Sequence, residues 1–270
     1  MATPREKVSS VDPIWTSMRQ QAEAMAGREP TLAGFVHATI LQHDRLEQAL
    51  SYHLARKLGG EDLSPLAIRE MFDQAVASDT AAGQAVRADL SAVFERDPAC
   101  HSYLDAFLFY KGFHALESFR VAHWLWREGR KAMALFLQSR ISQKFAVDIH
   151  PAAVMGRGIM IDHATGVVIG ETAVVEDDVS IMQDVTLGGT GKESGDRHPK
   201  VRRGVLISLG AKVLGNIEVG EYSRVGAGSV VLNSVPPGCT AVGVPAKLVN
   251  CKGSERPSHE MDHFIDDKSG

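Results

Sequence analysis

The chain has 270 residues, of which 44% are hydrophobic and 23% are charged, and its formal net charge is −4. This length allows two domains with a core each. The acidic balance argues against a nucleic-acid-binding protein, which usually carries a basic face. No apolar run approaches the length of a membrane-spanning helix, and the first residues contain no apolar signal segment. We therefore expect a globular protein with no nucleic-acid or membrane partner.

The three cysteines, Cys100, Cys239 and Cys251, follow no regular spacing and include no Cys-x-x-Cys pair. An odd number without such a pattern is typical of free thiols rather than of a disulfide framework. Free thiols persist in a reducing compartment. The sequence therefore predicts a soluble cytoplasmic protein.

Residues 1–146 are predicted to form a helical domain. Apolar residues recur at helical spacing, and glycine and proline residues separate the segments. Ser64-Pro65 begins a helix with proline in its first turn, and Asp97-Pro98 ends another. We expect helices over residues 13–27, 31–58, 64–76, 80–96 and 103–126, with a break near Gly112, and a last helix after Gly129.

Aliphatic residues then recur every six positions, from Ile149 to about Val235. A period of six fits neither an amphipathic helix nor a half-buried strand, and it is typical of a β-helix built from hexapeptide turns. The aliphatic side chains would fill the interior, and glycine would occupy corners. We predict an α + β protein with a β-helix over residues 147–249 and a flexible tail over residues 250–270. The aliphatic positions are Ile149, Met155, Ile161, Ile169, Val175, Ile181, Leu187, Ile207, Val213, Val219, Val225 and Val231.

The period stops between Gly188 and Leu206, where a glycine-rich, charged insertion predicts an extended loop that leaves the solenoid. Gly189-Thr-Gly-Lys192 resembles part of a phosphate-binding loop. That motif needs glycine at 186 and Ser or Thr at 193, where this chain has Thr186 and Glu193. A nucleotide triphosphatase is therefore disfavoured.

Two histidines of the second domain have a charged neighbour, in Asp162-His163 and in Arg197-His198. Asp148 precedes His163 by about one coil of a β-helix, so we expect the carboxylate and the imidazole to come close in space. A carboxylate bonded to one ring nitrogen orients the imidazole and makes the other nitrogen more basic, which suits a general base. The pattern fits a histidine held for structure alone equally well, and both interpretations stay open at this point.

Longer strings carry a resemblance to a known family: Lys111-Gly-Phe-His-Ala-Leu-Glu117, His123-Trp-Leu-Trp126, Asp148-Ile-His-Pro-Ala152, Asp162-His-Ala-Thr-Gly166, Gly170-Glu-Thr-Ala173, Val185-Thr-Leu-Gly-Gly-Thr-Gly-Lys192, Gly195-Asp-Arg-His-Pro-Lys200 and Leu214-Gly-Asn-Ile-Glu-Val-Gly220. With these strings, the chain from about Ile14 to Val249 resembles the bacterial serine acetyltransferases. The hexapeptide period is shared by many acyltransferases, whereas the helical half joined to the two histidine strings is specific.

The resemblance implies a helical oligomerisation domain followed by a left-handed parallel β-helix, and a homo-oligomer that is a trimer or a dimer of trimers. It implies direct transfer of acetyl from acetyl-CoA to L-serine, the first step of cysteine synthesis, with no tightly bound cofactor and no metal. L-Cysteine would inhibit by competing at the serine site. His163 would be the catalytic base and Asp148 its orienting carboxylate.

The resemblance also implies which residues hold the two substrates. The residues for serine or cysteine would be Asp97, Asp162, Arg197, His198 and Glu171, and His198 would also act in acyl transfer. The residues for acetyl-CoA would be Gly189, Leu209, Gly210, Ala227 and Lys247, with Arg202 and Arg203 near its phosphates. For Lys247, Arg202 and Arg203, solvated surface charge is an equal alternative. Leu209 stands where the family usually has a small residue, so it would narrow the acetyl-CoA groove.

Many members of the family insert a C-terminal isoleucine into O-acetylserine sulfhydrylase. This chain ends in Asp266-Asp-Lys-Ser-Gly270, so we do not expect that complex to form. Three other functions remain as alternatives: acyl transfer to a sugar or homoserine, a zinc hydratase, and a non-catalytic scaffold in which Leu209 blocks the groove. The solenoid offers only His150, His163 and His198, without the short spacing of zinc ligands, which disfavours the hydratase.

Overall fold

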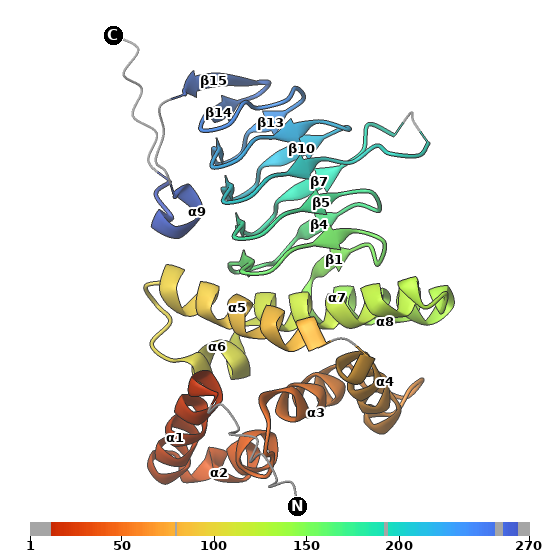
Figure 1. Cartoon of the computed structure of the whole chain (residues 1–270), viewed down its shortest axis with the longest axis vertical. Helices are drawn as coiled ribbons and strands as arrows, with labels where there is room; N and C mark the ends of the chain where they lie inside the picture. The colour runs from red at the N-terminus through yellow and green to blue at the C-terminus, as the bar shows by residue number, and fades with distance from the viewer. Residues whose placement is uncertain (1–11, 79, 192–193, 252–255, 264–270) are drawn as a thin grey trace, which may run out of the picture.

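The computed structural model describes residues 12–78, 80–191, 194–251 and 256–263, and it consists of a helical half below a β-solenoid (Figure 1). Helices α7 and α8 lie directly beneath the first coil of the solenoid (Figure 1). Among the residues placed by the structure, no helix is both long and apolar enough to cross a bilayer. The helices of this half are α1 (Pro13–Arg28), α2 (Pro30–Val36), the π-helix η1 (His37–Leu41), α3 (Leu46–Leu58), α4 (Pro65–Ser78), α5 (Thr80–Arg96), α6 (Tyr103–Phe109), α7 (Lys111–Arg127) and α8 (Lys131–Phe145).

The helix expected over residues 31–58 is divided, which corrects the sequence prediction. The chain passes through η1 and turns at residues 42–45 before α3 begins. The side chain of Gln48 accepts hydrogen bonds from the main-chain N–H groups of Asp44 and Arg45, at 3.2 and 3.3 Å. These bonds satisfy donors that have no intrahelical partner at the start of α3. The apolar residues keep their helical spacing across the turn, so the spacing alone predicted one long helix.

The solenoid is a three-sided prism with parallel strands, as the six-residue period predicted. The first sheet has the order β1-β4-β7-β10-β13, the second β11-β8-β5-β2, and the third β15-β14-β12-β9-β6-β3. The aliphatic residues of the period fill the interior, where Ile181, Ile207 and Val225 are fully buried on successive coils. The strands are β1 (Val147–Ile149), β2 (Val154–Met155), β3 (Met160–Ile161), β4 (Val167–Ile169), β5 (Val174–Val175), β6 (Ser180–Ile181), β7 (Thr186–Gly188), β8 (Lys200–Val201), β9 (Leu206–Ile207), β10 (Lys212–Leu214), β11 (Glu218–Val219), β12 (Arg224–Val225), β13 (Val230–Val231), β14 (Thr240–Gly243) and β15 (Ala246–Asn250).

The strand register shows where the coils differ in length. Val147 on β1 pairs with Val167, whereas Val168 on β4 pairs with Thr186, so the first coil is two residues longer than the second. The extra residues lie at the corner after β3, where His163 and Ala164 both have positive φ, 53° and 61°. The left-handed conformation costs a non-glycine residue on the order of 1 kcal/mol. The two-residue slip in the sequence period therefore marks a strained corner that carries a histidine.

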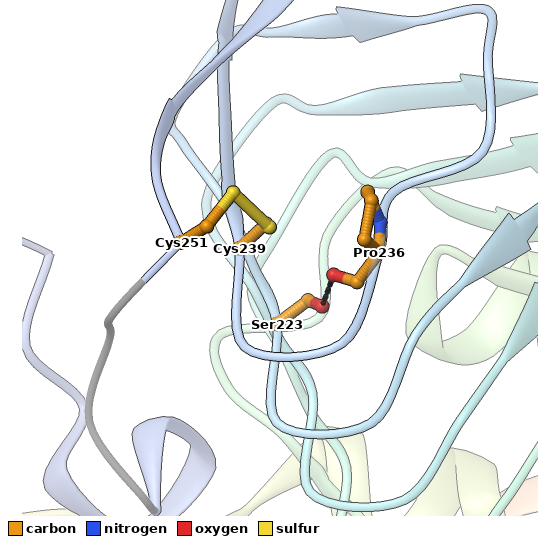
Figure 2. The surroundings of a disulfide bond; sticks show 4 residues. All are labelled: Ser223, Pro236, Cys239 and Cys251. Carbon is orange, nitrogen blue, oxygen red and sulfur yellow. Dashed lines mark hydrogen bonds between the residues drawn. A yellow bond between two sulfur atoms is a disulfide. The ribbon is translucent and has the colours of Figure 1, made fainter.

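The expectation of free thiols is wrong for two of the three cysteines. Cys239 and Cys251 form a disulfide, shown in Figure 2, and Cys100 is a buried free thiol. Strand β15 folds back antiparallel on β14, which places Thr240 opposite Asn250 and so brings the two neighbouring cysteines together. The hexapeptide period ends before this reversal, so no spacing pattern indicated the pairing. The cysteines of this chain therefore do not indicate a reducing compartment.

The tail beyond residue 250 is also more ordered than the sequence predicted. Residues Pro257–Glu260 form helix α9, which packs against α5 beside the solenoid (Figure 1). Pro257 and Ser258 are buried, and the carbonyl of Ser258 accepts a hydrogen bond from Ser180 at 2.8 Å. The stretch predicted as a flexible tail thus contains a short helix that contacts the rest of the molecule. Residues 266–270, which bear on the expected failure to bind O-acetylserine sulfhydrylase, lie outside the described residues.

Candidate active site

Two edges of the prism carry the predicted site residues. The His163 edge joins the third sheet to the first, and its corners are residues 162–166, 182–185, 208–211 and 226–229. The loop edge joins the first sheet to the second, and its corners include residues 150–153 and 170–173 and the insertion after Gly188. Strand β4 separates His163 from Glu171. The predicted residues thus form two groups within one chain.

On the His163 edge, the corners stack in register along the prism. Asp184 N–H donates to the carbonyl of Thr165, Gly210 N–H to that of Gln183, and Gly228 N–H to that of Leu209, at 2.8 to 2.9 Å. The predicted acetyl-CoA residues Leu209, Gly210 and Ala227 therefore lie in one column above the corner that carries His163. The Leu209 side chain is 42% exposed and points outward from this column. A groove ligand along this edge would meet Leu209 before it reached His163.

His163 presents its imidazole to the outside of the prism, since the side chain is 72% exposed. Its main-chain N–H donates to the Asp162 carboxylate at 2.8 Å, and its Nε2 atom lies 3.7 Å from the other carboxylate oxygen. Burial raises the pKa of Asp162, and His163 opposes that rise. Asp97, at the end of α5, adds a second negative charge that raises the same pKa. His163 is therefore an accessible imidazole beside the Asp162 carboxylate, and Asp97 lies close enough for its charge to act on Asp162.

Asp97 lies near a residue that the sequence did not single out. Burial, followed by the charge of Asp97, raises the pKa of the Tyr110 hydroxyl. Asp97 accepts the main-chain N–H of Ala99 at 2.8 Å. Tyr110 is the residue before α7, close to the break that the sequence predicted near Gly112. The only sequence signal near Tyr110 was its neighbour Lys111, the first residue of one of the strings that resemble the family.

The structure does not bring Asp148 to His163 within one chain, which corrects the expected contact. Asp148 lies on β1 and accepts a hydrogen bond from Gln138 at 2.6 Å. Asp148 pairs in register with Val168, because the first coil is twenty residues long (147 to 167), so His163 falls at a different edge. The charges of Glu171 and Asp148 both act on His150, whose pKa is lowered chiefly by burial. Asp148 therefore belongs to the loop edge.

The loop edge gathers the other predicted serine residues. Arg197 forms a salt bridge to Glu171 at 2.7 Å, and this hydrogen bond lowers the Glu171 pKa. His198 is 7% exposed, and burial, followed by the charge of Arg197, lowers its pKa. A β-carbon at Gly170 would lie 2.0 Å from His198 Nε2, so glycine is required for this approach. His198 is therefore a neutral, fixed imidazole at neutral pH.

The remaining predicted acetyl-CoA residues are dispersed. Gly189 lies near His198 on the loop edge, where its β-carbon would be 3.5 Å from Nε2, and Lys247 lies on β15. Arg202 pairs with Glu176 and Glu218, and Arg203 pairs with Asp178 at 2.8 Å. The guanidinium groups of Arg202 and Arg203 thus already have carboxylate partners, which favours surface charge over phosphate binding. Within the described ranges, no group of three or more His, Cys, Asp or Glu side chains is placed to hold a metal ion. Lys192 lies outside those ranges.

Comparison with known proteins identifies the family. Residues 14–118 match the family described as serine acetyltransferase, N-terminal. The serine acetyltransferase of Salmonella typhimurium is 57% identical over 252 residues, which cover 93% of this chain and 92% of that protein. The chain belongs to the serine acetyltransferase family. Family membership confirms the predicted acyltransferase.

Solved structures of other serine acetyltransferases have the same fold. The enzyme of Brucella abortus in complex with coenzyme A has a TM-score of 0.88 and 53% identity, covering 88% of this chain and 96% of that chain. A serine acetyltransferase in complex with cysteine has a TM-score of 0.92 and 52% identity, covering 93% and 98% of the two chains. The predicted helical domain followed by a parallel β-solenoid is confirmed. The individual site residues stay predictions.

Proposed function

We propose that this serine acetyltransferase transfers the acetyl group of acetyl-CoA directly to the hydroxyl of L-serine, with His163 as general base. The observation that carries the proposal is the exposed His163 imidazole beside the carboxylate of Asp162, on which the charge of Asp97 also acts. Two carboxylates suit the ammonium group of an amino acid. Arg197, on the loop edge, pairs with Glu171 through one nitrogen, and its remaining N–H donors suit the substrate carboxylate. The combination favours L-serine over a sugar as the acceptor.

The proposed step balances without a covalent enzyme intermediate. His163 accepts the proton of the serine hydroxyl as the oxygen attacks the thioester carbonyl of acetyl-CoA. The tetrahedral intermediate collapses, the carbon–sulfur bond breaks, and the CoA thiolate takes the proton from His163. His198 would donate a hydrogen bond to the developing oxyanion or to the substrate carboxylate. Holding both substrates together supplies much of the rate through orientation.

The two edges would come together between neighbouring subunits. Within one chain β4 separates the His163 group from the Arg197 group, so a site that uses both needs the loop edge of a second prism. That arrangement would also bring Asp148 of one subunit toward His163 of the next, where it can orient the imidazole. Closed cyclic symmetry makes a trimer of prisms the simplest assembly that provides such edges. The helical domains would then pair two trimers.

Acetyl-CoA would lie along the His163 edge, over the stacked corners that end in Leu209, Gly210 and Ala227. The coenzyme A complex of the Brucella abortus relative supports a CoA site in this fold. The cysteine complex of another relative supports L-cysteine as a competitor at the serine site.

The test is release of CoA thiol from acetyl-CoA and L-serine, with L-homoserine and glucosamine as alternative acceptors. His163→Ala should lower turnover by at least about a hundredfold, with the oligomer intact by light scattering. Half-reaction exchange between acetyl-CoA and CoA without serine would argue for an acyl-enzyme instead. Wild-type turnover in His163→Ala would refute its role as base.

Subunit sharing has its own test. His163→Ala and Arg197→Ala damage different edges, and each should be inactive as a homo-oligomer. When the two chains are co-expressed and assemble at random, roughly a quarter of the shared sites would contain both native edges. Recovery of activity in the mixed oligomer supports the shared site. Equal inactivity of the mixture would place each whole site within one chain.

A further inference from the structure

Thr172 forms several hydrogen bonds with the C-terminal end of the inserted loop. It follows Glu171 at the corner after β4, in a position that the six-residue period does not mark. Its hydroxyl oxygen accepts the main-chain N–H of Arg197 at 3.0 Å and that of His198 at 3.1 Å. Its carbonyl accepts Lys200 Nζ at 2.8 Å. Thr172 thus anchors the C-terminal end of the inserted loop at Arg197 and His198, two of the predicted site residues.

The contact between Thr172 and the His198 ring determines where the ring proton lies. Thr172 main-chain N–H donates to His198 Nδ1 at 3.2 Å, and Thr172 Oγ1 lies 2.9 Å from the same atom. A main-chain N–H can only donate, so Nδ1 must be unprotonated and accept. The hydroxyl has one proton to donate and two lone pairs, and those lone pairs already accept the N–H groups of Arg197 and His198. Nδ1, 2.9 Å away, is an acceptor for this proton, and the Asp196 carboxylate is a second group that the hydroxyl can reach.

With Nδ1 accepting the Thr172 main-chain N–H, the neutral ring carries its proton on Nε2. The Nε2 atom faces Gly170, where a β-carbon would lie 2.0 Å away, and Gly189, where it would lie 3.5 Å away. A side chain at Gly170 would collide with Nε2, and one at Gly189 would lie against it, so the two glycines leave space beside this atom. Burial lowers the His198 pKa, which keeps the ring neutral. His198 is thereby equipped to donate a hydrogen bond and not to accept a proton.

We propose that Thr172 is a positioning residue of the acetyl-transfer site, which holds His198 in the Nε2–H tautomer and so makes it a hydrogen-bond donor to the substrate. The inference rests on the proposed function for its effect on turnover, but the tautomer itself does not depend on substrate. It assigns different roles to the two histidines: His163 accepts a proton and His198 donates a hydrogen bond. A purely structural role for Thr172 would alter stability without altering the chemistry of His198.

The experiment compares Thr172→Val with Thr172→Ser. Valine keeps the shape and the main-chain N–H but removes the hydroxyl, whereas serine keeps the hydroxyl. We expect Thr172→Val to lower kcat/KM for L-serine about ten- to a hundredfold and Thr172→Ser to stay within about threefold of the unaltered enzyme. Thr240→Val, at a buried threonine in the last coil, is the matched control and should leave kinetics unchanged.

The pH profile of kcat/KM distinguishes a positioning role of Thr172 from a purely structural role. Loss of a donor to neutral Nδ1 makes His198 easier to protonate, so the acid limb of kcat/KM should move to higher pH in Thr172→Val and not in Thr172→Ser. The charged and titratable groups that act on His198 are Arg197, Glu171, Lys200 and His150, and all are unchanged in both variants. A lower melting temperature with an unchanged pH profile would show a structural role only and would overturn the proposal.

The tautomer can be measured without activity. Nitrogen-15 spectra of the substrate-free enzyme, with His198→Gln to assign the signal, should show Nε2 protonated and Nδ1 bare. Protonated Nδ1 would overturn the inference even if Thr172→Val were inactive or failed to fold. Absence of serine acetylation by the unaltered protein would refute the proposed function instead, and the spectra would still decide the tautomer.

Discussion

A β-carbon added to Gly112 would lie 1.9 Å from the carbonyl oxygen of Ile161, so helix α7 meets the first coil main chain to main chain. Lys111 donates to the hydroxyl of Thr165 on the other side of the same corner. Asp162 and His163 lie between these two contacts. The helical domain therefore supports the strained corner that carries the proposed base.

Gly112→Ala should damage this corner. The added methyl cannot fit against a carbonyl at that distance, so α7 or residues 161–164 must shift. We expect turnover with L-serine to fall at least about tenfold, because small displacements of a catalytic group are costly. Gly34→Ala is the matched control, since Gly34 lies in α2 with nothing near its β-carbon. Alanine favours a helix by about 1 kcal/mol over glycine, so the control should be stable and fully active. Full activity of Gly112→Ala would contradict the supporting role.

A buried ion pair joins the helical domain to the first coil. The Asp89 carboxylate is fully buried, accepts Arg120 Nε at 3.1 Å and accepts the main-chain N–H of Ile159 at 2.8 Å. Removing one partner of a buried pair costs roughly 3–5 kcal/mol, because the remaining charge is uncompensated. Asp89→Ala should therefore lower the free energy of unfolding by that order, measured with urea. Asp73→Ala, which removes an exposed partner of Arg69, should change it by less than about 1 kcal/mol. Equal effects of the two substitutions on the free energy of unfolding would show that the ion pair does not hold the helical domain to the first coil.

The disulfide between Cys239 and Cys251 closes the end of the solenoid over a separation of 12 residues. A cross-link over a short loop stabilises by roughly 2–3 kcal/mol in the chain-entropy description. Cys251→Ser should make β14 and β15 exchange amide hydrogens faster, with little change in the earlier coils. A reducing agent should have the same effect on the unaltered protein and none on the variant. Alkylation of two or more thiols in the unreduced, unfolded protein would show that the bond is absent.

The sequence predicted what repeats in the structure. Each coil needs an aliphatic residue at the same interior place, so Ile181, Ile207 and Val225 recur at a readable interval. Even the slip before Ile169 corresponds to a real feature, the two extra residues at the His163 corner. The solenoid could therefore be derived from spacing, whereas the residues assigned to the site came from the resemblance.

Features that depend on one particular contact were not predictable. The distance from Asp148 to His163 in sequence suggested one coil, but the first coil is longer and the two residues fall on different edges. The cysteine pair depends on the reversal of β15, which no spacing encodes. Thr172 resembles any other small corner residue, and only its bonds to His198 distinguish it.

The helical core contains histidines that titrate far from the solvent value. His53 is 4% exposed, its ring stacks on Phe107 with centroids 5.5 Å apart, and burial, followed by the charge of Lys57, lowers its pKa to about 3. The unfolded chain protonates the same group near pH 6.5. Between these values the unfolded state binds a proton that the folded state excludes. Exclusion of this proton therefore costs no stability above about pH 6.5. As the pH falls toward 3, the free energy of unfolding decreases progressively.

His53→Phe should make the helical domain less sensitive to acid. We expect the urea midpoint of the unaltered protein, followed by circular dichroism, to fall clearly between about pH 7.5 and about pH 5, and to fall less in the variant. His114, whose pKa burial also lowers, retains part of the dependence. His101→Phe, at an exposed histidine, is the matched control and should keep the full dependence. If the phenylalanine packs poorly against Phe107, the urea midpoint of the variant falls at both pH values. The difference between the two midpoints still reports the effect of protonation. An unchanged difference in His53→Phe would mean that other groups cause the acid sensitivity.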